Sequence, residues 1–176
     1  MKKTMLVMAV LALVAIAGYS EDSKESKEPA ELTTGKADYT VVNINDITDR
    51  AKNSVIGGKY PKLLWTSGMQ GYYNFKVEAK SGKKYYLYAL YTSEDSRPCV
   101  VKIKGKTFKS AFDRASGSYQ KDSLILGSVG PVEAKDGVID VKIKAKGYAP
   151  HFYGFFISET EVKTMTADEF DALGKN

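Results

Sequence analysis

Cysteine, histidine and tryptophan each occur once in this sequence of 176 residues. A single cysteine excludes an intramolecular disulfide bond. One cysteine and one histidine would leave any zinc site to be completed by carboxylates, and the sequence shows no spacing typical of zinc ligands. The chain also lacks a glycine-rich phosphate loop, a G-x-S-x-G turn and an H-E-x-x-H pair. The sequence does not exclude a pair of catalytic carboxylates, because such residues come together only in the fold. We therefore predict no catalytic residue, no metal site and no enzyme activity.

Long apolar runs are also scarce, and the longest covers residues 5–17. Its length of about 13 residues is short of the roughly 20 that a helix needs to cross a bilayer, so we predict no membrane span. Lys2 and Lys3 precede the run, and Ala15-Ile16-Ala17 offers the small-x-small pattern that signal peptidase requires. We predict that residues 1–20 are a signal peptide and that the protein is secreted or periplasmic.

Large apolar residues are nearly missing from residues 21–36, which are charged and predict a disordered linker. The rest of the chain suits one β domain over residues 37–160, followed by a C-terminal extension over 161–176. Residues 37–159 hold 19 Lys and Arg against 12 Asp and Glu. A basic surface favours anionic polysaccharide, lipid headgroups or nucleic acid as partners, although the lysines can equally be solvated strand faces.

Alternation of apolar and polar residues dominates this domain and predicts an all-β fold. The turn residues between the segments favour a two-sheet antiparallel β-sandwich of the jelly-roll type, with a short C-terminal helix. The expected strands cover residues 39–44, 72–79, 84–92, 99–104, 123–129, 138–145 and 151–158.

Local patterns make these expectations more specific. Residues 85–91 are apolar on both faces, which predicts a central strand, and residues 80–83 predict a hairpin loop that joins it to the preceding strand. Thr166 and Glu169 form a T-x-x-E capping box, so we expect a helix over residues 167–173. A second short helix is expected within residues 47–51.

Cys99 alternates with Val101 and Ile103, so it shares a face with apolar residues and should be buried. A buried free cysteine acts as a small hydrophobic residue. We therefore predict that Cys99 packs in the core and is not a nucleophile.

Aromatic residues outside the strand alternation are the most suggestive candidates for ligand binding. Trp65, Tyr119 and Tyr148 lie in stretches that read as loops, and rings of this kind hold the C–H faces of sugars. Arg97 could pair with a ligand carboxylate or sulfate, or equally with Glu94 or Asp95. The single histidine, His151, follows a proline at the entry to the last strand. These five residues, Trp65, Arg97, Tyr119, Tyr148 and His151, are the predicted ligand-binding residues.

Four segments carry a family resemblance: Gly71-Tyr-Tyr-Asn-Phe-Lys-Val77, Gly82-Lys-Lys-Tyr-Tyr-Leu-Tyr88, Ser96-Arg-Pro-Cys-Val-Val-Lys-Ile-Lys-Gly105 and Gly147-Tyr-Ala-Pro-His-Phe152. In this order they resemble carbohydrate-binding modules of the galactose-binding-like β-sandwich type. The resemblance covers about half of the chain. It implies a sugar site in loops at one end of the sandwich and a calcium ion that braces the fold. Tyr153 and Gly154 stand where such modules often carry Asn or Asp, so we predict no cofactor.

Three functions fit these observations. The first is an exported non-catalytic protein that binds a polysaccharide or oligosaccharide, with a preference for acidic glycans and no nucleic-acid partner. The second is an envelope or secreted scaffold of the same fold that binds another protein. The third is a lysozyme inhibitor that would insert the Ser-Gly-Ser-Tyr loop of residues 116–119 into an enzyme cleft, although a basic domain would repel a basic lysozyme.

Overall fold

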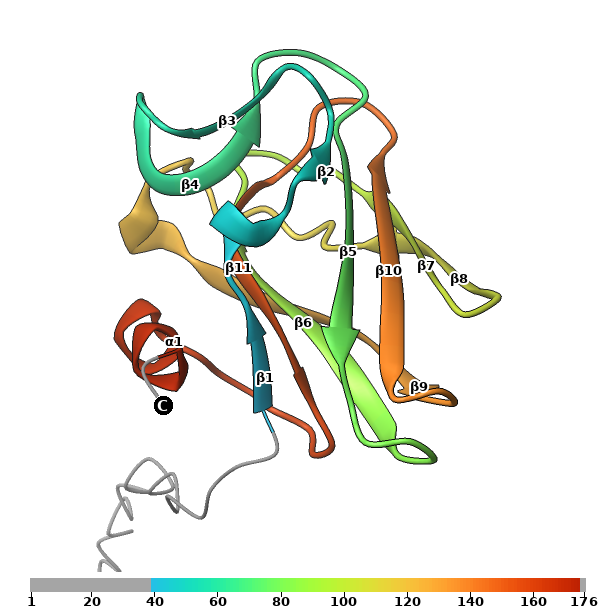
Figure 1. Ribbon diagram of the computed structural model, residues 1–176. Helices are drawn as coiled ribbons and strands as arrows, with labels where there is room; N and C mark the ends of the chain where they lie inside the picture. Colours follow the sequence, from blue (N-terminus) through green and yellow to red (C-terminus); the bar gives the residue numbers. More distant parts are fainter. Residues whose placement is uncertain (1–38, 175–176) are drawn as a thin grey trace, which may run out of the picture. The chain divides into compact units, whose positions relative to one another are not determined.

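The computed structural model describes residues 39–174 of the chain (Figure 1). The chain divides into two units, Met1–Gly35 and Lys36–Asn176, and the described residues belong to the second unit. The expected signal peptide and linker lie outside the described residues. Among residues 39–174, no helix is long and apolar enough to cross a membrane.

Two antiparallel sheets pack face to face and form a sandwich (Figure 1). Sheet A has the strand order β3 (Ser54–Gly57), β4 (Tyr60–Thr66), β11 (His151–Ser158), β6 (Lys84–Thr92) and β9 (Ile125–Glu133), and β1 (Tyr39–Val42) also pairs with β11. Sheet B has the order β2 (Asp49–Arg50), β5 (Tyr72–Glu78), β10 (Val138–Ala145), β7 (Cys99–Ile103) and β8 (Lys106–Ala111). Two 3-10 turns, Ile44–Asp46 and Lys121–Ser123, and the helix α1 (Ala167–Leu173) complete the domain. The prediction of an all-β sandwich with a C-terminal helix is confirmed.

Strand β10 shows how alternation builds the core between the sheets. Ile139, Val141 and Ile143 are fully buried, whereas Lys142 and Lys144 on the opposite face are exposed. Burial of an aliphatic side chain of this size stabilises the fold by roughly 1.5–3 kcal/mol. The strand therefore keeps one face in the core and the other in water, as its sequence predicts.

Strand β6 is the predicted central strand, because it lies between β11 and β9. Its inner face joins the core, and its outer face belongs to a second apolar cluster that covers sheet A. In that cluster the ring of Tyr88 stacks on Phe156 at a centroid distance of 4.7 Å. The hydroxyl of Tyr88 accepts a hydrogen bond from the backbone N–H of Val162 at 2.7 Å. The segment after β11 thus covers the outer face of sheet A.

Helix α1 forms where its capping box predicts it. The Thr166 side chain accepts a hydrogen bond from the backbone of Glu169, and the Glu169 side chain accepts one from the backbone of Thr166. Phe170 is the buried residue of the helix, and its ring lies against Gly154 of β11. The hydroxyl of Tyr153 donates to Oδ1 of Asp171 at 2.6 Å. Together these contacts fix the helix to sheet A.

Two local expectations are wrong. Residues 80–83 do not form a hairpin loop, because β5 belongs to sheet B and β6 to sheet A. Strand β6 is apolar on both faces, so it needs a position that is covered on both sides. Sheet A provides that position, whereas the outer face of sheet B is exposed to water. Residues 47–51 form no helix. Asn43 caps a 3-10 turn over Ile44–Asp46, and β2 then pairs with β5.

Candidate functional site

The structure brings all five predicted binding residues together, at the end of sheet A where β11 begins. The ring of Tyr119 stacks on His151 at a centroid distance of 4.6 Å, and the ring of Trp65 lies 5.9 Å from His151. The guanidinium carbon of Arg97 lies 4.6 Å from the centroid of Tyr119 and 5.4 Å from that of Tyr148. With Tyr60 these residues form what we call the aromatic end cluster. Their role in ligand binding stays a prediction.

Tyr60 lies at the centre of the cluster and was missed from the sequence. Its ring contacts His151 at 4.4 Å, Trp65 at 5.3 Å and Tyr119 at 5.9 Å. Trp65 itself lies on β4 and not in a loop, so that expectation is wrong. Pro61 and Lys62, which has a φ of 61°, interrupt the alternation of this strand and hide it in the sequence.

Arg97 ties the loops of the cluster together. Its Nε donates to Oδ1 of Asp95 at 2.6 Å, its Nη1 donates to the carbonyl of Ala149 at 3.3 Å, and its Nη2 donates to the hydroxyl of Tyr119. The hydrogen bond from Arg97 lowers the pKa of Asp95. Of the two alternatives for Arg97, the structure shows the pair with Asp95. A guanidinium has five N–H groups, so two remain for a ligand.

Tyr148 is the ring of the cluster with the largest exposed surface. Its exposed fraction is 53%, whereas Trp65 and Tyr119 are half-buried. The indole N–H of Trp65 donates to the carbonyl of Gly57 at 3.0 Å, which fixes that ring within the fold. Tyr148 therefore offers the ring surface on which a ligand could stack.

His151 is buried and neutral at physiological pH. Burial, together with the positive charges of Arg97 and Lys59, lowers its pKa to about 4. Within residues 39–174, its Nδ1 has no hydrogen-bond partner. A neutral imidazole packed between aromatic rings supports the shape of the cluster, and its low pKa makes it a poor base near neutral pH.

Cys99 is buried in the core between the sheets, as its position in the alternation predicts. Burial raises the pKa of its thiol to about 12. The thiolate is the reactive form, so this thiol should be inert in the folded protein.

Labelling Cys99 with a disulfide reagent tests this assignment. In native buffer at mildly alkaline pH we expect the thiol to react at least about a hundredfold more slowly than in concentrated urea, because both access and the thiolate fraction are lower. Absorbance of the released thiolate measures both rates. Fast labelling of the native protein would show that Cys99 is accessible and reactive.

The family resemblance implies a calcium ion, and the carboxylates of the described residues bear on it. A protein calcium site uses six to eight oxygen ligands, several of them from carboxylates. Within residues 39–174, no group of three or more His, Cys, Asp or Glu side chains could hold a metal ion. The described part of the chain therefore lacks a carboxylate-rich cradle for this ion.

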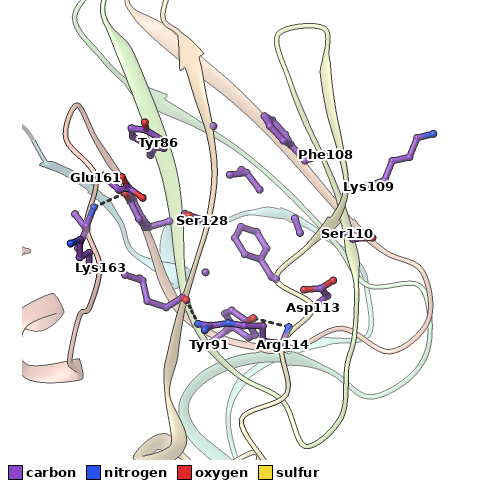
Figure 2. Close-up of a pocket in the computed structure, with 18 residues that line it drawn as sticks. Tyr86, Tyr91, Phe108, Lys109, Ser110, Asp113, Arg114, Ser128, Glu161 and Lys163 are labelled. Atoms are coloured by element: carbon purple, nitrogen blue, oxygen red, sulfur yellow. Dashed lines mark hydrogen bonds between the residues drawn. The ribbon is translucent and has the colours of Figure 1, made fainter.

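A separate groove of about 730 Å³ lies beside β9, one of the edge strands of sheet A (Figure 2). Nη2 of Arg114 donates to the carbonyl of Leu126 at 2.6 Å, and Nζ of Lys106 donates to the carbonyl of Pro131 at 3.1 Å. These bonds and the missing N–H of Pro131 disfavour addition of another strand to this edge. The lining carries charges of both signs, on Lys109, Asp113, Arg114, Glu161 and Lys163. The groove therefore selects no class of ligand by charge.

The loop of residues 116–119 is fixed to the sandwich. The backbone N–H of Ser93 donates to Oγ of Ser116 at 3.0 Å, and the ring of Tyr119 packs inside the aromatic end cluster. A loop that inserts into an enzyme cleft has to present its tip, and here the tyrosine is engaged by its own protein.

Of the comparisons with known proteins, the one with solved structures bears on the fold. No protein-family model matches the sequence, and no curated protein matches it. Among solved structures, a family 35 carbohydrate-binding module from Clostridium thermocellum is similar, with a TM-score of 0.55 and 15% sequence identity over 69% of this chain and 98% of that one.

Two further structures show the same likeness. The family 6 module of Cellvibrio mixtus lichenase 5A, solved in complex with cellotriose, has a TM-score of 0.54 and 12% identity over 69% of this chain and 98% of its own. The family 35 module from Paenibacillus barcinonensis has a TM-score of 0.52 and 13% identity over 68% of this chain and 97% of its own. The chain therefore shares the β-sandwich fold of these modules, as its sequence resemblance implies.

Proposed function

We propose that this protein is an exported, non-catalytic carbohydrate-binding protein whose site is the aromatic end cluster. The observation that carries the proposal is the exposed ring of Tyr148, which Arg97 holds beside Tyr119 at the loop end of the sandwich. The fold shared with carbohydrate-binding modules supports it. The apolar run of residues 5–17 behind two lysines supports export.

The chemistry of the cluster suits a sugar. The ring of Tyr148 offers apolar surface to the C–H face of a pyranose, and the two remaining N–H groups of Arg97 can donate to ring or hydroxyl oxygens. The carboxylate of Asp95, whose side chain is 66% exposed, can accept hydrogen bonds from hydroxyl groups. Arg97 is already held by three hydrogen bonds, so little side-chain freedom is lost on binding.

The candidate nucleophile and base support a binding role rather than catalysis. Cys99 is buried with a raised pKa, and His151 is buried with a lowered one. Within residues 39–174, no hydrogen bond joins the two residues, although a nucleophile needs a base within hydrogen-bond reach.

Replacement of Tyr148 by alanine tests the proposal. Affinity electrophoresis through gels that contain a panel of neutral and acidic polysaccharides should show retardation by at least one polymer. Tyr148→Ala should weaken that binding at least about tenfold, because the stacking surface is lost, whereas Tyr148→Phe should retain it. Tyr148 is exposed, so neither variant should change the free energy of unfolding by more than about 0.5 kcal/mol.

Two outcomes would contradict the proposal. If Tyr148→Ala binds like the wild type, the site lies elsewhere. If no polymer retards the wild type, the alternative function as a protein-binding scaffold gains support. The rings of Trp65 and Tyr119 already contact other rings of the same domain, which suits a structural role. Pull-down experiments with proteins from the same compartment would then be the next step.

A further inference from the structure

The outer face of sheet B carries three neighbouring lysines, Lys102 on β7 and Lys142 and Lys144 on β10, which we call the lysine strip. Lys142 lies directly opposite Lys102 in the antiparallel register. Lys144 lies two residues further along the same face, at a spacing of about 7 Å. All three side chains are exposed.

The residues directly opposite Lys102 and Lys142 on the strands that flank this pair are uncharged. On the β5 side, Lys142 lies opposite Asn74. Nδ2 of Asn74 donates to Oδ2 of Asp49 at 2.9 Å, so the carboxylate beyond Asn74 is already hydrogen-bonded to that amide. On the β8 side, Lys102 faces Thr107, which is uncharged.

Lys144 is in a similar position, because it lies between Tyr72 of β5 and Val100 of β7. Within residues 39–174, no ion pair includes Lys102, Lys142 or Lys144. The strip therefore places positive charge on an exposed surface.

Two acidic residues border the strip, because Asp136 and Asp140 line the same hollow as Lys102 and Lys142, and Asp140 lies two residues before Lys142 on β10. Lys104 pairs with Asp136 at 3.4 Å, and Asp140 lies opposite Lys76. Like charges directly opposite each other on neighbouring strands repel, and an anion bound between them removes the repulsion. A hollow of about 630 Å³ gives such an anion room, and four lysines outnumber two carboxylates in its lining: Lys102, Lys104, Lys106 and Lys142 against Asp136 and Asp140.

The lysine strip leads directly to the aromatic end cluster. Strand β10 ends at Ala145, and the loop that follows carries Tyr148. Backbone hydrogen bonds from Ala145 to the carbonyl of Gly71, and from Gln70 to the carbonyl of Gly147, hold this loop beside the start of β5. There Tyr72, with an exposed fraction of 38%, offers a ring next to Lys144. A polymer bound at Tyr148 could therefore continue along β10 over the lysines.

We propose that the outer face of sheet B extends the sugar site and takes the carboxylate or sulfate groups of an acidic polysaccharide. This inference rests on the proposed function, because Tyr148 anchors the same chain. Lysine suits spaced acidic groups as a compact point charge. Strands β5, β7, β8 and β10 contain no arginine, which nucleic-acid surfaces favour, and Tyr72 is the only exposed large aromatic residue on them among residues 39–174.

The test compares acidic polymers with neutral polymers of the same backbone. The probes are polygalacturonate with its methyl ester, dextran sulfate with dextran, and carboxymethylcellulose with hydroxyethylcellulose. The full chain should bind at least one acidic polymer at least tenfold more tightly than its neutral counterpart, and added salt should remove this preference. Lys102→Gln/Lys142→Gln/Lys144→Gln should abolish the preference and leave binding of the neutral polymer unchanged.

A matched control removes the same charge elsewhere. Lys52, Lys84 and Lys163 are exposed and lie outside strands β5, β7, β8 and β10, so their triple glutamine variant should keep the preference. If both triple variants lose it equally, net charge and not the strip is responsible, and the inference is wrong.

The remaining outcomes separate this inference from the proposed function. Binding of neutral polymers that depends on Tyr148, without preference for any acidic polymer, would contradict the proposed role of the lysine strip and support the sugar site at Tyr148. Binding of no polymer at all would overturn both. If the protein binds duplex DNA as tightly as the best acidic polysaccharide, and the strip variant loses this binding, the ligand of the lysine strip is a nucleic acid and the inference is wrong.

Discussion

Acidification from about pH 7 to about pH 4 is expected to lower the free energy of unfolding by on the order of 3 kcal/mol through His151 alone. The pKa of this buried side chain is lowered to about 4 in the folded protein, whereas an unfolded histidine titrates near 6.5. The unfolded chain therefore takes up the proton first as the pH falls. Stability is fully present above about pH 6.5, declines below it and levels off below about pH 4.

Urea unfolding at several pH values measures this effect. The sequence holds no other histidine, so the loss between about pH 6.5 and pH 5, above the range of ordinary carboxyl groups, can be assigned to one residue. His151→Phe keeps a ring against Tyr60 and Tyr119 and should remove most of the pH dependence in this window. Parallel stability profiles for the wild type and His151→Phe would contradict the assignment.

Gly154→Ala is expected to destabilise the protein by about 1–3 kcal/mol and to loosen helix α1. A methyl group at this position would overlap the ring of Phe170, whose Cζ and Cε1 lie against the glycine. Both groups are fixed, because Gly154 lies on β11, an interior strand of sheet A, and Phe170 is buried. The helix therefore has to move away from the sheet or the strand has to bend.

Gly147→Ala is the matched control, because no atom lies within 4 Å of a methyl group at that position. It should unfold at nearly the wild-type urea concentration. A double variant with Gly154→Ala and Phe170→Leu should recover part of the stability, since the smaller side chain makes room. If Gly154→Ala unfolds like the wild type, the helix does not depend on this contact.

The fold was predictable where the hydrophobic pattern is continuous. The bounds of β6, β10 and β11 agree with the sequence, because β10 alternates strictly while β6 and β11 are apolar on both faces. Strand β4 was missed because Pro61 and the left-handed Lys62 break the pattern. The link between β5 and β6 was misread as a hairpin, since local turn chemistry does not reveal to which sheet each strand belongs.

The sequence predicted which residues the cluster contains, apart from Tyr60, but not how they contact each other. Aromatic rings outside the alternation pointed to Tyr119 and Tyr148, which the fold places around Arg97. Tyr60 was missed because its strand was missed. The partner of Arg97 was left open, because the choice between Asp95 and Glu94 depends on the path of the loop that carries all three residues.

The cover over the outer face of sheet A limits how many polymers one copy can hold. Helix α1 and the segment before it occupy that face through Phe170 and Val162, whereas Lys102, Lys142 and Lys144 on the outer face of sheet B are exposed. A single copy that binds as proposed would contact a polysaccharide from one side only and act as a monovalent ligand. Added to a dilute solution of a long polymer, it should decorate individual strands without cross-linking them into a gel.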